Sequence, residues 1–291
     1  MKKVFIDENI QVHEGDDATR LMDASRRTDD SVQSPARVDL ARWQEAQRYE
    51  RRTWMEKNLA SATDRNEYHR RMFGGYAALA GRRFDRAIEL GCGPFTNMRM
   101  ILPSCAIGEL TLLDPLITDY LLHPYCQYKN SRLGGIFNVR PHAKNPLILA
   151  ALLYKNFSLG GFFGRPVQII SGMIEQYELD QTFDLVVMVN VLEHCQDVQV
   201  VFDKIEAMLK PGGYFVFHDR LLDSETVKTL SERLYDSGHP LRIQDAVIEE
   251  FLSSNFSPLF MEKRSVSRDF RGIHWKEIEL YFIGVFGNPP I

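Results

Sequence analysis

The sequence predicts an α/β fold built on a mostly parallel sheet, and three observations favour it. From about residue 83 onward, short apolar runs alternate with helical segments, which is the pattern of a parallel sheet. The first apolar run ends in a Gly-x-Gly turn that leads toward a helical segment. Hydrophobic residues make up 44% of the chain and charged residues 25%, as expected of a domain that buries a large core.

Each expected strand is a short apolar run bounded by Gly, Pro, Asp or Asn. In chain order, the five strands of the parallel part are expected at residues 86–90, 109–113, 167–170, 183–189 and 213–218. Two later apolar runs, at 259–266 and 278–286, predict a terminal antiparallel pair.

Two regions precede the sheet. Residues 1–38 are polar and acidic, which predicts a loosely ordered lead-in. Residues 39–82 carry apolar side chains at helical spacing and predict an N-terminal helical cap, followed by the main domain at 83–291. Between residues 42 and 83 there are ten Lys or Arg against five Asp or Glu. This excess predicts either a basic patch for phosphate-bearing substrates or a solvated helix face.

The interval between the second and third expected strands is too long for one crossover helix. This insert, residues 115–165, is rich in aromatic residues and contains an apolar helical run at 145–154. Three roles fit such a segment: a lid over a substrate pocket, a homodimer contact, or core of an enlarged domain.

Composition and charge argue against several classes of protein. A net charge of −4 gives no overall attraction to nucleic acid or to an anionic membrane. Four cysteines without Cys-x-x-Cys spacing argue against a zinc ribbon or a thioredoxin-type site. No run reaches the roughly 18 apolar residues of a membrane span, and Asp7 and Glu8 interrupt the N-terminus before a signal peptide can form. We therefore expect a cytoplasmic protein without a membrane partner.

The segment Glu89–Asn97 carries the strongest chemical signal. Gly91 and Gly93 allow a sharp turn and a close approach of backbone to ligand, and the start of the following helix is expected to offer free N–H groups. Asp114 ends the next strand, where a carboxylate can accept both hydroxyl protons of a ribose. A dinucleotide oxidoreductase is the alternative, but Thr96 stands where its third glycine would be.

Further motifs follow this segment in a recognisable order. They are Leu112–Pro115, Phe183–Val187, Val191–His194 and Leu209–Gly213. Over about residues 84–217 the sequence resembles the small-molecule branch of class I S-adenosylmethionine-dependent methyltransferases. The resemblance implies a seven-stranded, mostly parallel Rossmann-like sheet with an antiparallel final hairpin. It also implies S-adenosyl-L-methionine as the cofactor and makes 83–291 a methyltransferase domain.

The resemblance implies contacts with the methionine and ribose of the cofactor. Gly91 and Gly93 would form the turn against these groups, and Glu89 would meet the methionyl ammonium directly or through water. Asp114 would hold the ribose hydroxyls. Phe95 replaces a glycine that is usual in this loop.

The resemblance also implies contacts at the two later strands. Met173 and Ile174 would frame the adenine, although Met173 stands where the family usually has an acidic or polar residue. Asn190 would meet the methionine moiety through its backbone. In some quinone-type relatives a Glu-His pair and an earlier acid bind a metal. Asn190 occupies that earlier position here, so no metal is expected.

Methyl transfer from a sulfonium depends mainly on alignment of the nucleophile, and an oxygen nucleophile usually needs a base as well. The candidates at the carboxyl ends of the strands, and in the segment that can fold back over them, are His194, His218 and His239. A packing role at a helix start is the alternative for His194.

The predicted function is transfer of the methyl group of S-adenosylmethionine to an oxygen or nitrogen of a small molecule such as a metabolite, natural product or sugar. Two alternatives stay open: a protein or RNA methyltransferase, and a catalytically silent binding module. An Asn-Pro-Pro run at residues 288–290 resembles a motif of enzymes that methylate adenine amino groups. It lies far from the fourth strand, so we expect a small-molecule acceptor rather than nucleic acid, with a homodimer through the insert as a further partner.

Overall fold

The computed structural model describes residues 36–57, 62–123, 126, 167–178, 181–270 and 272–287. Its sheet has seven strands in the order β3-β2-β1-β4-β5-β7-β6. The strands are β1 Arg83–Leu90, β2 Ala106–Asp114, β3 Val167–Ser171, β4 Phe183–Val189, β5 Leu209–Leu221, β6 Phe256–Phe270 and β7 Ile273–Phe286. The predicted seven-stranded α/β fold is therefore confirmed.

The first five strands pair in parallel, and β7 pairs antiparallel with both β5 and β6. The predicted terminal antiparallel pair is thus present, and it is longer than the apolar runs suggested. β5 also begins earlier than expected, at Leu209, because the Lys-Pro-Gly-Gly segment joins the strand with a register shift opposite Phe183 and Leu185.

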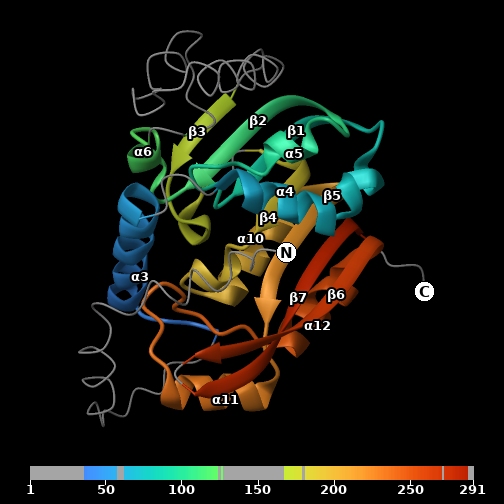
Figure 1. Cartoon of the computed structure of the whole chain (residues 1–291). Helices are drawn as coiled ribbons and strands as arrows, with labels where there is room; N and C mark the ends of the chain where they lie inside the picture. The colour runs from blue at the N-terminus through green and yellow to red at the C-terminus, as the bar shows by residue number, and fades with distance from the viewer. Residues whose placement is uncertain are drawn as a thin grey trace, which may run out of the picture.

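Helices cover both faces of this sheet (Figure 1). Alternate residues of each strand point to opposite faces, so Ile88 and Ala87 belong to two separate core clusters. The cluster around Ile88 includes α10 (Val198–Met208) and α12 (Asp245–Asn255). The cluster around Ala87 includes the N-terminal helices and α5 (Met98–Ile101). The result is three layers, with each sheet face buried.

Where the structure describes it, the predicted helical cap contains four helical segments. They are α3 Leu40–Arg52, the π-helical turn η2 Thr53–Lys57, α4 Ala62–Met72 and the 3₁₀ segment η3 Gly74–Leu79. Phe73, Tyr76 and Leu79 are buried in the same cluster as β1 and β2, so the cap shares the core of the sheet.

The predicted lead-in, residues 1–38, lies mostly outside the described residues. Its last three residues differ from the prediction because they pair with the start of α10. The Val38 N–H donates to the Gln196 carbonyl at 2.9 Å, the Val198 N–H donates to the Ala36 carbonyl at 2.9 Å, and Val38 is buried.

The long interval between the second and third strands is real, since β2 ends at Asp114 and β3 begins at Val167. Of the insert 115–165, only residues 115–123 and 126 are described, and they include the short helix α6 (Ile117–Tyr120). Its roles as a lid, a dimer contact or core stay predictions. The Asn-Pro-Pro run also lies outside the described residues.

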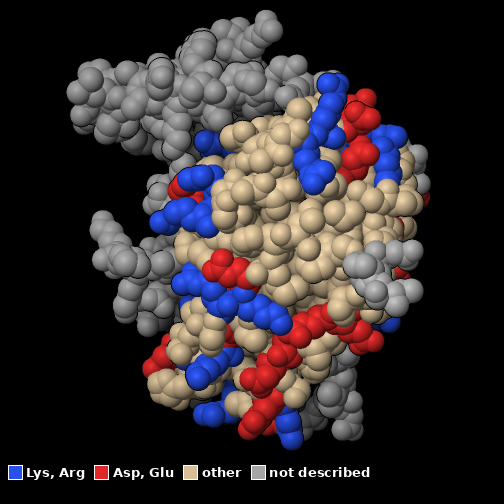
Figure 2. Space-filling view, turned by 90° about the vertical axis from the view of Figure 1, so that its right-hand side faces the viewer, with Lys and Arg blue, Asp and Glu red and all other residues tan. Residues whose placement is uncertain are grey.

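The sheet order places a topological switch point at β1, whose neighbours are β2 on one side and β4 on the other. In open α/β sheets, ligands bind at the carboxyl ends of the strands beside such a point. No helix in the described part of the chain is long and apolar enough to cross a membrane. On the face shown in Figure 2, Lys and Arg are interspersed with Asp and Glu and form no single basic patch.

Candidate functional site

The turn after β1 requires glycine at two positions. Gly91 has φ +64°, and a Cβ built there would lie 2.5 Å from both Cγ atoms of Val191. Gly93 has φ +55°, with open space where its Cβ would be. The Gly91 N–H donates to the Leu113 carbonyl at 2.8 Å, and the Gly93 N–H donates to Asp114 Oδ2 at 3.0 Å. The turn is therefore fastened to the end of β2.

Glu89 lies beneath this turn rather than on the cleft surface. It is 1% exposed, and its carboxylate accepts hydrogen bonds from the Thr96 hydroxyl and, at 2.8 Å, from the Asn97 N–H. Burial raises the pKa of Glu89 to about 7. Two of the N–H groups that were expected to be free at the helix start are therefore engaged, those of Asn97 with Glu89 and of Met98 with the Thr96 hydroxyl at 3.1 Å. The helix itself, α5, is a single turn at Met98–Ile101, because Pro103 follows it closely.

A cleft opens at the carboxyl ends of β1, β2 and β4, with an open volume of about 900 Å³ that includes space toward solvent. Most residues predicted to bind the cofactor line it: Gly91, Gly93, Asp114, Met173, Ile174 and Asn190.

Two acidic residues, Asp114 and Glu175, line the cleft on the side of the sheet. The two oxygens of Asp114 accept hydrogen bonds from the Gly93 N–H and, at 2.8 Å, from the Leu116 N–H. Burial raises the pKa of Asp114 to about 6.

The chain leaves β4 through a strained residue. Asn190 has φ +59°, a conformation that non-glycine residues rarely adopt and that asparagine tolerates best. Its N–H donates to the His218 carbonyl at 2.7 Å. Asp219 then accepts hydrogen bonds from the Val191 N–H at 3.2 Å and the Leu192 N–H at 2.7 Å. These contacts hold the turn that carries the 3₁₀ segment η5, Leu192–His194.

The cap supplies the opposite wall of the cleft. Its lining residues come from α3, η2 and α4: Trp43, Gln47, Glu50, Trp54, Arg65, Asn66 and His69. The Asn66 side chain donates to the carbonyls of Phe95 at 2.9 Å and Thr96 at 3.0 Å. This contact fastens α4 to the loop that follows Gly93.

Two polar side chains that line the cleft were given no role in the sequence analysis. Arg65 faces the Trp54 ring at 5.5 Å and has no ion pair within 4.0 Å among the described residues. Asn97 lines the cleft, and its buried Oδ1 has no hydrogen-bond partner in the described part of the chain. Docking of the cap places Arg65 in the cleft, whereas Asn97 reaches it from the loop that follows the Gly91–Gly93 turn. The basic excess of residues 42–83 was the available signal for Arg65.

The three candidate histidines occupy different environments. His194 lines the cleft. His218 is 2% exposed and stacked on Tyr281 with ring centroids 4.1 Å apart, and it does not line the cleft. His239 does not line the cleft but contacts His194, with ring centroids 4.8 Å apart. Burial lowers the pKa of His194, and it lowers the pKa of His218 to about 3.

A buried charge network surrounds His239. Its Nδ1 lies 2.8 Å from Asp236 Oδ2, and its Nε2 lies 3.2 Å from Arg220 Nη2. Arg220 also forms an ion pair with Glu193. Burial opposes the charge of His239, but Asp236 and Glu193 raise its pKa to about 9. Burial likewise opposes the charge of Glu193, but Arg220 and His239 lower its pKa to about 2.

A family model described as a methyltransferase domain matches residues 64–259, which is more than half of the chain. The chain therefore belongs to the methyltransferase domain family. The family predicted from the sequence is confirmed, and the expectation of S-adenosylmethionine as methyl donor is confirmed at the level of that family.

Individual relatives are more distant. The chain is 29% identical over 136 residues to the ubiquinone biosynthesis O-methyltransferase of Nitrobacter winogradskyi, a match that spans 46% of this chain and 42% of that protein. Among solved structures it is similar to the N-methyltransferase NodS of Bradyrhizobium japonicum WM9 in complex with S-adenosyl-L-homocysteine. The TM-score is 0.48 at 16% identity, covering 85% of this chain and 99% of that one.

A second solved structure is 1,6-didemethyltoxoflavin-N1-methyltransferase from Burkholderia thailandensis. The TM-score is 0.42 at 15% identity, covering 85% of this chain and 89% of that one. At such scores and identities, neither solved structure indicates a substrate for this chain.

Proposed function

We propose that this chain transfers the methyl group of S-adenosylmethionine to an oxygen or nitrogen of a small molecule. The observation that carries the proposal is the cleft at the switch point, where the Gly91–Gly93 turn and Asp114 meet in a chain of the methyltransferase domain family. The name of the Nitrobacter relative, an O-methyltransferase, supports oxygen as one acceptor atom.

The cofactor would lie along the strand ends. Asp114 would accept the two ribose hydroxyl protons, because its carboxylate lines the cleft beside the turn. The adenine would pack between Met173 and Ile174, which are apolar and line the same side. Asn190 would meet the methionine moiety through its backbone.

The charged end of the methionine would lie between the loop after Gly93 and the cap. Asn97 Oδ1 is a buried acceptor without a partner among the described residues, so it suits the methionyl ammonium. Glu89 would act through Asn97, since the Asn97 side chain donates to Glu89 Oε1 at 3.2 Å. Arg65, a cleft-lining cation without an ion pair in the described part of the chain, suits the methionyl carboxylate.

Alignment of the acceptor would supply most of the rate enhancement. The new bond forms between the acceptor atom and the methyl carbon, and the electron pair of the broken S–CH₃ bond stays on sulfur. The acceptor would be activated at the group formed by Glu50, His194 and His239, which we call the cap triad. His218 is not part of this proposal, since its ring lies away from the cleft.

The experiment is calorimetric titration of the full chain with S-adenosylmethionine and S-adenosylhomocysteine, with NAD⁺ as the comparison ligand. We expect heat and a thermal shift with the first two and neither with NAD⁺. Binding of NAD⁺ alone would instead support a dinucleotide oxidoreductase.

A second arm tests transfer. Incubation of the full chain with a cell extract and methyl-labelled S-adenosylmethionine should place the label in the small-molecule fraction. Label in precipitated protein or RNA would contradict the small-molecule acceptor. Cofactor binding without transfer to any fraction would favour the silent binding module.

A further inference from the structure

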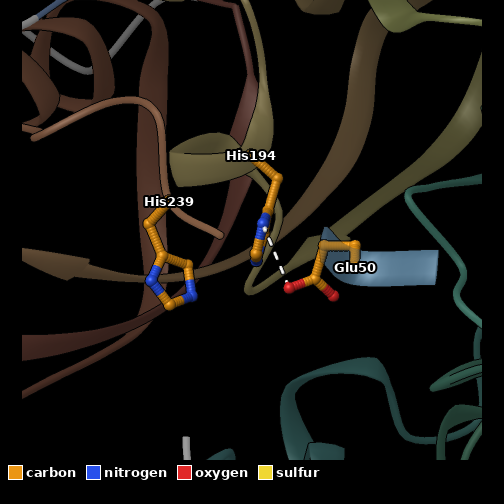
Figure 3. A group of neighbouring side chains, drawn as sticks. All are labelled: Glu50, His194 and His239. Atoms are coloured by element: carbon orange, nitrogen blue, oxygen red, sulfur yellow. Dashed lines mark ion pairs between the residues drawn. The ribbon is translucent and has the colours of Figure 1, made fainter. Parts of the chain in front are cut away.

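Three side chains from distant parts of the chain meet at the cap side of the cleft. Glu50 comes from α3, His194 from η5, and His239 from the segment between α11 (Ser224–Arg233) and α12. One ligand-type atom of each lies within 4.8 Å of the other two. Figure 3 shows the His194 side chain between those of His239 and Glu50.

Both imidazoles are held through the same ring nitrogen. His194 Nδ1 lies 3.0 Å from the Gly238 carbonyl oxygen, and His239 Nδ1 lies 2.8 Å from Asp236 Oδ2. A carbonyl and a carboxylate accept hydrogen bonds, so each Nδ1 carries a proton and Nε2 is the nitrogen left for a metal ion. At a pKa of about 9 the His239 ring also carries a proton at Nε2, which a bound metal ion displaces. Histidines that bind metals usually have this arrangement, with the second nitrogen donating to a carbonyl or a carboxylate.

Glu50 is placed by contacts on either side of it. Its Oε2 accepts a hydrogen bond from Trp54 Nε1 at 2.8 Å, and its Oε1 lies 3.9 Å from His194 Nδ1. α3 is fastened to both histidine segments, because Gln47 Nε2 donates to the His194 carbonyl at 3.3 Å and Arg42 Nη1 donates to the Ser237 carbonyl at 3.3 Å. The cap helix therefore brings its carboxylate to a fixed place beside the imidazoles.

Glu193 stands next to the cap triad but has another partner. Its Oε1 lies 3.8 Å from His194 Nε2 and 3.7 Å from His239 Nε2, and it forms an ion pair with Arg220. The Glu-His pair that binds metal in some quinone-type relatives is therefore not available as a unit in this chain. Arg220 Nη2 lies 3.2 Å from His239 Nε2, beside the position that a metal ion bound to this nitrogen would take.

We infer that Glu50, His194 and His239 bind one divalent transition-metal ion, and that the methyl acceptor is a hydroxyl compound whose oxygen completes the coordination. Two imidazoles and one carboxylate suit Zn²⁺, Co²⁺, Fe²⁺ or Mn²⁺, and a three-ligand site keeps positions open for substrate. The ion displaces the contact between Arg220 and His239, while Arg220 keeps its ion pair with Glu193.

The metal gives the acceptor oxygen its reactivity. A hydroxyl bound to the ion becomes more acidic, so its proton passes to bulk water and the resulting oxyanion attacks the methyl carbon. The electron pair of the S–CH₃ bond leaves with sulfur, giving S-adenosylhomocysteine and the methyl ether. This catalytic use rests on the proposed function, whereas binding of the metal does not.

The test is titration of the full chain, stripped with a chelator, with Co²⁺ followed by visible absorbance, and then displacement by Zn²⁺. We expect one equivalent to bind. Glu50→Gln, His194→Ala and His239→Ala should each weaken binding by at least about tenfold. Asp236→Asn removes only an outer partner of the site and should weaken binding by about 10- to 100-fold.

His274→Asn is the matched control. His274 also faces a carboxylate, with its Nδ1 3.1 Å from Asp269 Oδ2, but its side chain is 72% exposed and lies on the hairpin. This variant should bind Co²⁺ like the wild type. Equal weakening in His274→Asn and His194→Ala would overturn the assignment of the site.

Titration of every variant with S-adenosylhomocysteine separates loss of metal from loss of fold. A wild-type chain that binds S-adenosylhomocysteine but no Co²⁺ would overturn the inference and leave the proposed function standing. Binding of Co²⁺ without S-adenosylhomocysteine would support the metal site and contradict the proposed function. Full methyl transfer by the stripped chain would overturn the role of the metal in catalysis.

Discussion

The two walls of the cleft are built in different ways. The strand-end wall consists of the Gly91–Gly93 turn, Asp114 and the segment at Met173, which all follow strands of one sheet. The cap wall carries Arg65 and Glu50 from two helices, and His194 lines the cleft beside them from the 3₁₀ turn after β4. His239, the third member of the cap triad, contacts His194 from a loop. The first wall depends on backbone geometry, and the second depends on side chains that meet only after the cap has docked.

This difference separates two tasks. A parallel sheet places the ends of neighbouring strands side by side, so glycines and one carboxylate are enough to form a nucleotide site. Recognition of an acceptor needs side chains of particular chemistry, and the cap can supply these without any change to the sheet. Variants of the strand-end wall should therefore affect cofactor binding, and variants of the cap wall should affect the charged end of the methionine and the acceptor.

The largest effect on the strand-end wall is expected from Gly91→Ala. The added Cβ would lie 2.5 Å from Val191 Cγ atoms at a φ of +64°. Overpacking costs about 1–3 kcal/mol and the positive φ adds about 1 kcal/mol, so the melting temperature should fall. A turn that shifts to relieve this strain loses its place against the cofactor, so affinity for S-adenosylhomocysteine should fall by up to roughly 100-fold. Calorimetry measures this change.

Gly81→Ala is the control, since Gly81 has φ +71° with nothing within 4 Å of the added Cβ. It should lower the melting temperature slightly and leave the affinity unchanged. Equal affinity in Gly91→Ala and wild type would mean that the turn does not approach the cofactor.

Asp114→Asn should have the next largest effect. It removes a charged acceptor for the ribose hydroxyls, which is worth about 1.5–3 kcal/mol, or roughly 10- to 100-fold in affinity. Asp119→Asn, which removes an ion pair with Arg51 outside the cleft, should change the affinity little. A similar loss in both variants would contradict the assignment of Asp114 to the ribose.

Arg65→Met tests whether the cap wall binds the amino acid end of the cofactor while the strand-end wall binds the nucleoside. It should weaken binding of S-adenosylhomocysteine by roughly tenfold, because a hydrogen bond between charged groups contributes about 1.5 kcal/mol or more. Binding of 5′-methylthioadenosine, which lacks the amino acid end, should not change. If both ligands lose affinity equally, Arg65 does not bind the carboxylate.

The pH dependence of cofactor affinity should report on Asp114, whose pKa is raised to about 6 by burial. Ribose hydroxyls donate to the ionised carboxylate, so binding favours the ionised form and protonation opposes it. Affinity for S-adenosylhomocysteine should therefore be level above about pH 7 and fall by up to about tenfold per unit below pH 6. In Asp114→Asn the profile between pH 5 and 6 should be flatter, and an unchanged slope would assign the titration to another group.

The smallest effect is expected at Asn190, where the change concerns the backbone. At φ +59° an alanine should lower the free energy of unfolding by about 1 kcal/mol, whereas glycine should keep it close to that of the wild type. Urea denaturation of Asn190→Ala and Asn190→Gly measures both. A more stable alanine variant would mean that this turn is not strained.

Much of the fold could be predicted because each strand leaves a local signal at its place along the chain. All seven strands lie where apolar runs bounded by Gly, Pro, Asp or Asn predicted them. The extent of β5 could not be predicted in this way, because its first residues join the sheet through a register shift between Phe183 and Leu185. The start of α5 could not be predicted either, because Glu89, buried beneath the loop, accepts a hydrogen bond from the N–H of its N-cap residue Asn97.

The functional site likewise has some features that the sequence predicts and others that depend on the tertiary structure. The sequence by itself determined the family, the Gly91–Gly93 turn and Asp114, because a sharp turn after one strand and a carboxylate at the end of the next are local requirements. Tertiary structure alone decided that Glu89 lies under the turn, that Asn97 and Arg65 face the cleft, and that Glu50, His194 and His239 meet. For Arg65 and the cap triad the physical reason is that the contacts join segments far apart in the chain, whose separation is set by how the cap packs on the sheet. For Glu89 and Asn97 the contacts are only seven or eight residues apart, and burial of the carboxylate beneath the loop decides them.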